Sequence, residues 1–199
     1  MTDQKNPLQM LFHWADKHPG KPFLYQATNG EWKALTWGEV ADQVRRMAGA
    51  LKALLPPGSK VAISGRNTAH WIMADQAIAM AGMVSIGLYP KQSEAHTRFI
   101  LEHSESKLVF VGPAPDMAEF MGSIPKGIKT CSFPYADVPS CDHDWNDLVS
   151  KHAPQQEVPV ARPDDLLTLI YTSGTTGNPK GVMITYGNMM FAAKGLEQV

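Results

Sequence analysis

Segments of strand length alternate with segments of helix length between residues 60 and 111, and this order restricts the fold more than any other feature. Three short apolar runs predict buried strands, at 61–64, 84–88 and 108–111. The segments between them, 68–81 and 93–103, predict helices. A repeated strand–helix–strand order is typical of parallel βαβ units. We therefore expect an α/β fold in which a layered sheet carries helices on both faces.

The first sixty residues carry clear start and turn signals. Asn6-Pro7 suits the start of a helix, because proline is tolerated at the first helical position. Thr36 and Glu39 have the spacing of a capping box, which would open a helix that ends before Pro56. Asn29-Gly30 separates two strand-like segments and predicts a β-hairpin. The expected order is helix, hairpin, helix.

Residues 113–165 contain eight prolines, which leave room only for short elements, such as one over residues 144–151. We interpret this region as a connecting segment at the surface and not as an independent domain. It holds both cysteines, Cys131 and Cys141, with His143 nearby. Two thiols and one imidazole at this spacing match no zinc pattern, so we predict two reduced thiols and no metal site.

The most specific chemistry lies in residues 166–199. Apolar runs at 166–170 and 182–185 predict two strands, and a helix is expected from about residue 188. The sequence between the strands reads Tyr171-Thr-Ser-Gly-Thr-Thr-Gly-Asn-Pro-Lys-Gly181. The glycines at 174, 177 and 181 permit a positive φ and a close approach of the backbone to a ligand.

This loop combines the groups that a polyphosphate requires. Its backbone N–H groups can form an anion-binding nest, and Lys180 adds a mobile positive charge. Hydroxyl donors come from Thr172, Ser173, Thr175 and Thr176. The spacing fits neither a Walker A loop, nor the dinucleotide pattern Gly-x-Gly-x-x-Gly, nor the esterase pattern Gly-x-Ser-x-Gly. An ordinary surface turn is the alternative, but an eleven-residue string between two apolar strands favours phosphate binding.

The string from Tyr171 to Gly181 resembles the signature loop of the adenylate-forming superfamily, which includes acyl-CoA synthetases, luciferases and the adenylation domains of peptide synthetases. Weaker resemblances precede it in the same order, at residues 35–40 and 80–90. Residues 87–90, 100–104 and 178–183 look most like long-chain fatty acyl-CoA synthetases. The resemblance implies that residues 1–199 are the N-terminal portion of an AMP-binding domain.

The resemblance also implies a reaction that uses ATP, Mg²⁺ and coenzyme A. A carboxylate, with a long-chain fatty acid expected, would attack the α-phosphate of Mg·ATP to give an acyl-adenylate and pyrophosphate. A thiol, expected to be coenzyme A, would then displace AMP. Lys180 would offset negative charge on the departing pyrophosphate. The residues that would hold the β- and γ-phosphates are Thr172, Ser173, Gly174, Thr175, Thr176 and Gly177. We assign no general base and no metal ligand.

Later motifs of the family are not found in the sequence: an adenine-binding segment with a metal-linked glutamate, a ribose-binding aspartate and the lysine of a small C-terminal domain. We therefore expect a fragment that clamps pyrophosphate and is inactive alone. Two alternatives stay open. One is an adenylation enzyme with another acceptor, either a carrier protein or the oxygen chemistry of luciferases. The other is a phosphate-binding or interaction module without catalysis.

The composition argues against several other partners. With 18 basic and 19 acidic side chains the formal charge is −1, and no basic patch supports nucleic-acid binding. The N-terminus lacks the pattern of a secretory signal. The apolar stretch from residue 71 to 88 contains Asp75 and Gly82, which argues against a transmembrane helix. We expect a cytoplasmic protein, with peripheral membrane association open, that acts on a fatty acid or another small carboxylic acid.

Overall fold

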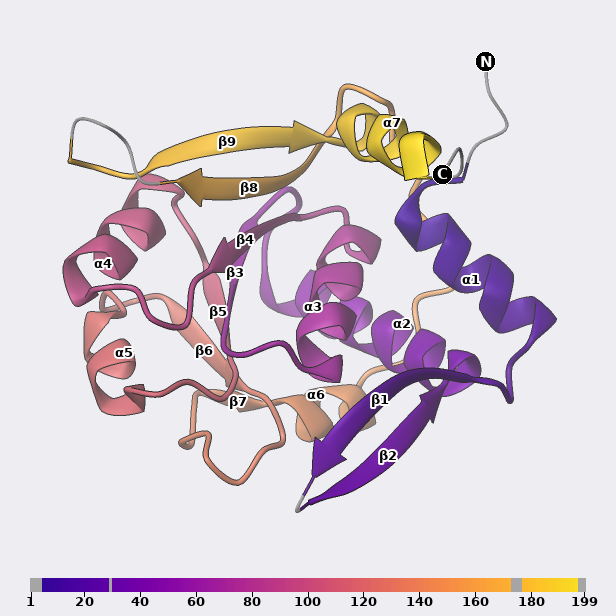
Figure 1. The fold of residues 1–199 in the computed structure, drawn as a ribbon, viewed down its shortest axis with the longest axis horizontal. Helices are drawn as coiled ribbons and strands as arrows, with labels where there is room; N and C mark the ends of the chain where they lie inside the picture. The colour runs from indigo at the N-terminus through magenta and orange to yellow at the C-terminus, as the bar shows by residue number, and fades with distance from the viewer. Residues whose placement is uncertain (1–4, 29, 173–176, 197–199) are drawn as a thin grey trace.

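A mixed sheet of seven strands forms the centre of the computed structural model, which describes residues 5–28, 30–172 and 177–196 (Figure 1). The strand order is β7-β6-β5-β3-β4-β8-β9, and every neighbouring pair is parallel except β8 and β9. The strands are β3 (Lys60–Ser64), β4 (Val84–Leu88), β5 (Leu108–Val111), β6 (Lys129–Ser132), β7 (His143–Asp144), β8 (Leu166–Thr172) and β9 (Lys180–Thr185).

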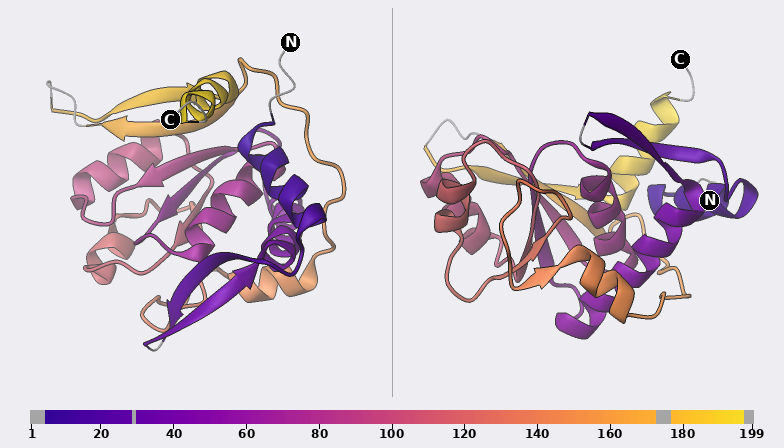
Figure 2. Two further views of the ribbon diagram at one scale, coloured as in Figure 1. Left: turned by 45° about the vertical axis from the view of Figure 1, so that its right-hand side comes forward. Right: turned by 90° about the horizontal axis from the view of Figure 1, so that it is seen from below.

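Helices cover both faces of this sheet, so the predicted α/β fold is confirmed (Figures 1 and 2). One face is covered by α1 (Pro7–Lys17), α2 (Trp37–Leu54), α3 (Ala69–Met80) and α6 (Trp145–Lys151). The other face is covered by α4 (Glu94–His103) and α5 (Met117–Ser123). A last helix, α7 (Tyr186–Leu196), follows β9 directly, in agreement with the helix expected there.

The chain crosses the sheet in two directions. It passes from β3 through α3 to the adjacent β4, then returns through α4 to β5 on the far side of β3. Right-handed crossovers in opposite directions must place their helices on opposite faces, which is why α3 and α4 lie on different sides. In sheets of this type, ligands bind where the winding direction changes, outside the carboxyl ends of the strands. Here that position lies between the ends of β3 and β5, because the chain leaves β3 towards β4 and leaves β5 towards β6.

The helix starts follow the capping signals of the sequence. The Asn6 side chain accepts a hydrogen bond from the backbone of Gln9 at 2.9 Å, and the Gln9 side chain accepts one from the Asn6 backbone at the same distance. Thr36 and Glu39 form the capping box that their spacing predicts. Each such pair satisfies backbone N–H groups that have no partner within the helix.

The predicted N-terminal hairpin is present as a separate two-stranded sheet, formed by β1 (Pro22–Thr28) and β2 (Glu31–Thr36). Asn29 lies outside the described residues, and Gly30 has a φ of +81°. Phe23 of β1 stacks on Trp37 at the start of α2, with 3.6 Å between the ring centroids. This contact joins the hairpin to the helical layer that covers the sheet.

Residues 113–165 are more than the surface connection that we expected, because they also contribute to the sheet and to the core. β6 and β7 come from this region and extend the parallel sheet at one edge. Phe133 is 1% exposed and Trp145 is fully buried, and both contact the ring of Phe110 on β5. Prolines limit these elements to two to seven residues, but short strands are sufficient at a sheet edge.

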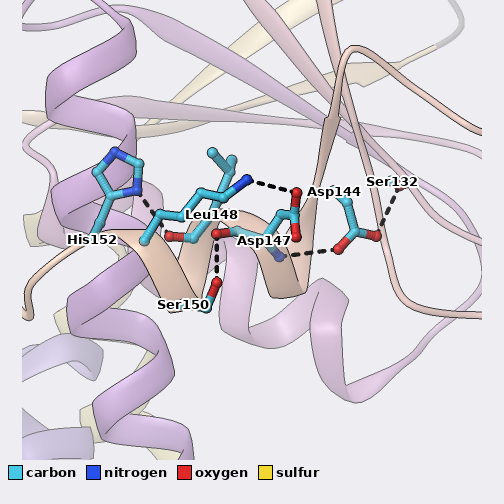
Figure 3. A network of polar contacts seen from close by, with 7 residues as sticks. Ser132, Asp144, Asp147, Leu148, Ser150 and His152 are labelled. Atoms are coloured by element: carbon cyan, nitrogen blue, oxygen red, sulfur yellow. Dashed lines mark hydrogen bonds and ion pairs between the residues drawn. The ribbon is translucent and has the colours of Figure 1, made fainter.

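The short helix α6 is held in place by the polar contacts of Figure 3. Asp144 caps it by accepting a hydrogen bond from the backbone of Asp147 at 3.1 Å, and Ser132 on β6 donates to the same carboxylate at 3.4 Å. At the other end, the ring of His152 contacts the Leu148 carbonyl at 2.9 Å. These contacts fix Trp145 against the sheet.

None of the helices in the described part of the chain combines the length and the apolar character that a membrane span requires.

Candidate functional site

The loop that we predict to bind phosphate, called the phosphate loop below, connects Thr172 at the end of β8 to Lys180 at the start of β9, and the register of this hairpin brings its two ends together. Thr172, the last residue of β8, pairs with Lys180, the first residue of β9. Directly opposed residues of antiparallel strands have Cβ atoms about 4.5–5.5 Å apart and project from the same face. The Thr172 and Lys180 side chains therefore leave the backbone side by side. Both side chains are exposed, and no described carboxylate pairs with Lys180.

The strands extend further than the sequence suggested, so Thr172 and Lys180 belong to the hairpin and not to the loop proper. Gly177 has a φ of +101°, the left-handed conformation expected of a loop glycine. The other predicted binding residues, Ser173, Gly174, Thr175 and Thr176, lie outside the described residues. Their role stays a prediction.

Gly181 has a different role from the one we predicted. It is not among the glycines with positive φ, and it lies in a regular strand position opposite Tyr171. A Cβ atom at residue 181 would lie 3.1 Å from Cζ of the Tyr171 ring, which is closer than ordinary packing allows. Glycine is needed here because the tyrosine ring lies against the neighbouring strand.

Tyr171 anchors the hairpin to the body of the sheet, a feature that sequence reasoning missed. Its side chain is 3% exposed and packs with the cluster that α4 and α5 cover. The Tyr171 Oη lies 2.8 Å from Nδ1 of His103 on α4, and the rings meet edge to face. Burial raises the pKa of Tyr171 above its usual value, so the phenol is protonated at neutral pH. The 68-residue separation left no signal in the local sequence.

A cavity of about 600 Å³ opens beside the described end of the phosphate loop. It lies between the segment that follows β4, the first turns of α4, and the end of β8. Its polar lining includes Lys91, His96 and Thr172, and its apolar lining includes Ile100 and Tyr171. Lys91 contributes one positive charge to this lining, which suits an anionic ligand.

A second cavity, of about 410 Å³, lies at the carboxyl ends of β3 and β4. It is mainly apolar, with Trp71 from α3, Ile170 from β8 and Met189 from α7 in its lining. Asp75 contributes a carboxyl group, whose pKa is raised by burial. Because successive side chains of a strand alternate between faces, Ile170 and Thr172 project from the same face of β8. This cavity and the phosphate end of the hairpin therefore share one surface.

The cysteine region is separate from both cavities. Cys131 is fully buried on the face covered by α1, α2, α3 and α6, whereas Cys141 packs with the cluster on the opposite face. Burial raises the pKa of both thiols, which disfavours the reactive thiolate. Among the described residues, no group of three or more histidine, cysteine, aspartate or glutamate side chains is arranged to hold a metal ion.

Comparison with known proteins identifies a family for this arrangement. The family model described as "AMP-binding enzyme" matches residues 11–199. Long chain acyl-CoA synthetase 5 of Arabidopsis thaliana is 28% identical over 91% of this chain and 30% of its own length. The long-chain-fatty-acid–CoA ligase FadD15 of Mycobacterium bovis is 29% identical over 97% of this chain and 33% of its own length. The chain spans about a third of the length of these relatives.

Solved structures agree with the sequence comparison. Acetoacetyl-CoA synthetase from Streptomyces lividans superposes with a TM-score of 0.80 at 25% identity, over 97% of this chain and 32% of that one. The O-succinylbenzoate coenzyme A synthetase of Bacillus subtilis, in complex with AMP, gives a TM-score of 0.72 at 27% identity, over 97% of this chain and 45% of that one. With a family model that covers nearly the whole sequence, the chain belongs to the AMP-binding enzyme family.

Proposed function

We propose that this chain is part of an AMP-forming acyl-CoA ligase, which activates a carboxylic acid with ATP and then transfers the acyl group to coenzyme A. The observation that carries the proposal is the register pair Thr172–Lys180 at the base of the phosphate loop, in a chain of the AMP-binding family. Its relatives include proteins named long-chain acyl-CoA synthetases. Magnesium would enter with ATP as part of the substrate.

In this proposal the hairpin acts by positioning and by charge. The Thr172 hydroxyl would donate a hydrogen bond to a phosphate oxygen of ATP. The Lys180 ammonium, on the same face and exposed, would approach the β- and γ-phosphates and offset the charge that gathers on pyrophosphate as it leaves. The carboxylate of the acid is itself the nucleophile, so the reaction needs no nucleophilic side chain from this chain.

We propose a long-chain fatty acid as the substrate class. Two features of the same face support it. The cavity at the carboxyl ends of β3 and β4 is mainly apolar. Ile170, which lines it, pairs with Val182 on β9, and each of these residues is 44% exposed. An alkyl chain that covers these side chains would remove apolar surface from water, at about 25 cal/mol per Å². A short or charged acid would gain little from this surface.

Equilibrium binding of pyrophosphate and of Mg·ATP to the 199-residue chain, followed by calorimetry, tests the phosphate role. Loss of one charge-assisted contact in Lys180→Ala should weaken pyrophosphate binding about tenfold or more. Lys107→Ala is the matched control, because Lys107 is also exposed but precedes β5 at the amino end of the strands. Equal affinities in Lys180→Ala and the original chain would contradict the assignment.

Activity requires a second measurement. We expect the 199-residue chain alone to show no ATP–pyrophosphate exchange, and a protein that carries this sequence at the length of its relatives to show exchange that depends on a fatty acid. In the longer protein, a series of fatty acids of increasing chain length would test the substrate class. Preference for acetate over palmitate would contradict the long-chain proposal, and exchange by the short chain would contradict its expected inactivity.

A further inference from the structure

The two ends of the β8–β9 hairpin are held by separate sets of contacts. At the end away from the loop, Arg162 donates to the carboxylate of Asp165 at 2.9 Å and 3.0 Å, and the Tyr186 backbone donates to the Asp165 carbonyl at 3.0 Å. At the loop end, the contacts come from Tyr171, with His103 on α4 and Gly181 on β9 as its neighbours. The loop end therefore depends on a helix distant in sequence.

The contacts at the loop end form a continuous stack. Phe99 and His103, one turn apart on α4, stack with 5.2 Å between ring centroids. His103 then meets Tyr171 edge to face, with 5.9 Å between centroids and an interplanar angle of 90°, and its Nδ1 contacts the phenol oxygen. The Tyr171 ring in turn covers Gly181 across the hairpin. The stack joins α4 to both strands that enter the loop.

We infer that His103 is a positioning residue for the phosphate loop, which acts through Tyr171. By fixing the Tyr171 ring, His103 fixes the backbone immediately before Thr172 and, through Gly181, the backbone immediately after Lys180. The two groups proposed to contact phosphate are thereby held in register before a ligand arrives, and preorganisation of this kind lowers the entropy lost on binding. The inference rests on the proposed phosphate role of Thr172 and Lys180, but the anchoring itself is testable without a ligand.

Two variants separate the hydrogen bond from the ring packing. Tyr171→Phe keeps the ring and its contact with Gly181 but removes the hydroxyl. His103→Leu removes the partner of the hydroxyl, whereas His103→Asn places an amide group near the position of Nδ1 and should restore the contact. The matched control is Arg162→Ala, which loosens the opposite end of the same hairpin.

Amide hydrogen exchange of the 199-residue chain, measured without ligand, is the first test. We expect faster exchange in residues 168–172 and 180–182 for Tyr171→Phe and His103→Leu, by about two- to tenfold, and near-original rates for His103→Asn. Arg162→Ala should affect only the opposite end of the hairpin. Unchanged exchange at the loop end in both Tyr171→Phe and His103→Leu would overturn the inference.

Pyrophosphate affinity provides the functional test. We expect about two- to tenfold weaker binding in His103→Leu, recovery in His103→Asn, and no further loss when His103→Leu and Tyr171→Phe are combined, because both remove one contact. In the longer enzyme, KM for ATP should rise while KM for the acid stays constant. If the original chain does not bind pyrophosphate, the proposed function loses its support, and the exchange experiment still decides whether His103 anchors the loop.

Discussion

The inner strands of the sheet and the β8–β9 hairpin differ in how far their side chains are buried. All four residues of β5 are buried, and so are four of the five residues of β3. In β9 no residue is fully buried, and Met183 is 65% exposed. The inner strands pack helices on both faces, whereas β8 packs one face through Leu169 and Tyr171, and β9 is accessible to solvent on both faces. Stability should therefore depend on the inner strands, and phosphate binding on the hairpin.

The largest expected effect is a core truncation in an inner strand. Phe110 on β5 is fully buried and lies 5.7 Å from both the Phe133 and the Trp145 ring centroids. Phe110→Ala should reduce the free energy of unfolding by about 3–5 kcal/mol, because it removes buried surface and leaves a cavity. Urea denaturation would measure this loss. Ile170→Ala in the hairpin is the comparison. An equal loss in the free energy of unfolding there would show that stability does not depend more on the inner strands than on the hairpin.

The second effect is a loss of stability in mild acid. Burial lowers the pKa of His70 from 6.5 to about 4, so the folded protein binds this proton less readily than the unfolded chain. The free energy of unfolding is therefore highest above pH 6.5 and decreases as the pH falls towards 4. Below pH 4 this contribution changes no further, and the total loss is roughly 3 kcal/mol at most. Denaturation midpoints between pH 7 and 4 would measure it. His70→Gln should show a shallower dependence, and an identical slope would exclude His70 as the cause.

A smaller effect is expected at the packing contact between the two strands of the hairpin. Gly181→Ala places a methyl group 3.1 Å from the Tyr171 ring, which must move to accept it. We expect a loss of about 1 kcal/mol in stability and weaker pyrophosphate binding. Thermal unfolding and calorimetry would measure both quantities. Gly20→Ala is the control, because Gly20 lies outside the helices and strands and a Cβ there meets nothing within 4 Å.

The smallest effect on stability is expected at Val182 on β9. Val182→Thr keeps the shape of an exposed side chain and adds a hydroxyl, so the free energy of unfolding should change by less than about 0.5 kcal/mol. Binding of a long-chain acid by the longer enzyme should weaken nonetheless. A large change in the free energy of unfolding with unchanged acid binding would show that Val182 contributes to folding and does not contact the acid.

The sequence predicted those parts of the fold that depend on local chemistry. Apolar runs identified β3, β4 and β5, and caps at Asn6 and Thr36 identified helix starts, because each signal lies within a few residues. The edge strands β6 and β7 were not predicted. Their pairing partners are distant in the chain, and a strand of two to four residues has too few positions for a hydrophobic pattern.

The site was predictable to a similar extent. The composition of the loop indicated phosphate binding, but the pairing of Thr172 with Lys180 depends on strand register, which the spacing alone did not determine. The role of Gly181 was misread, because a glycine needed for close packing and a glycine needed for positive φ are identical in sequence. The contact of His103 with Tyr171 is purely tertiary.

The antiparallel return of β9 has an electrostatic consequence. In many phosphate-binding folds the loop leads directly into a helix, whose N-terminal dipole contributes about half a positive charge in a fixed position. Here the loop runs from strand to strand, so the fixed dipole of a following helix is absent from its flanks. In the proposed role, the attraction of pyrophosphate would then depend on the mobile charge of Lys180, which is exposed to solvent ions. Pyrophosphate affinity should therefore fall steeply as ionic strength rises.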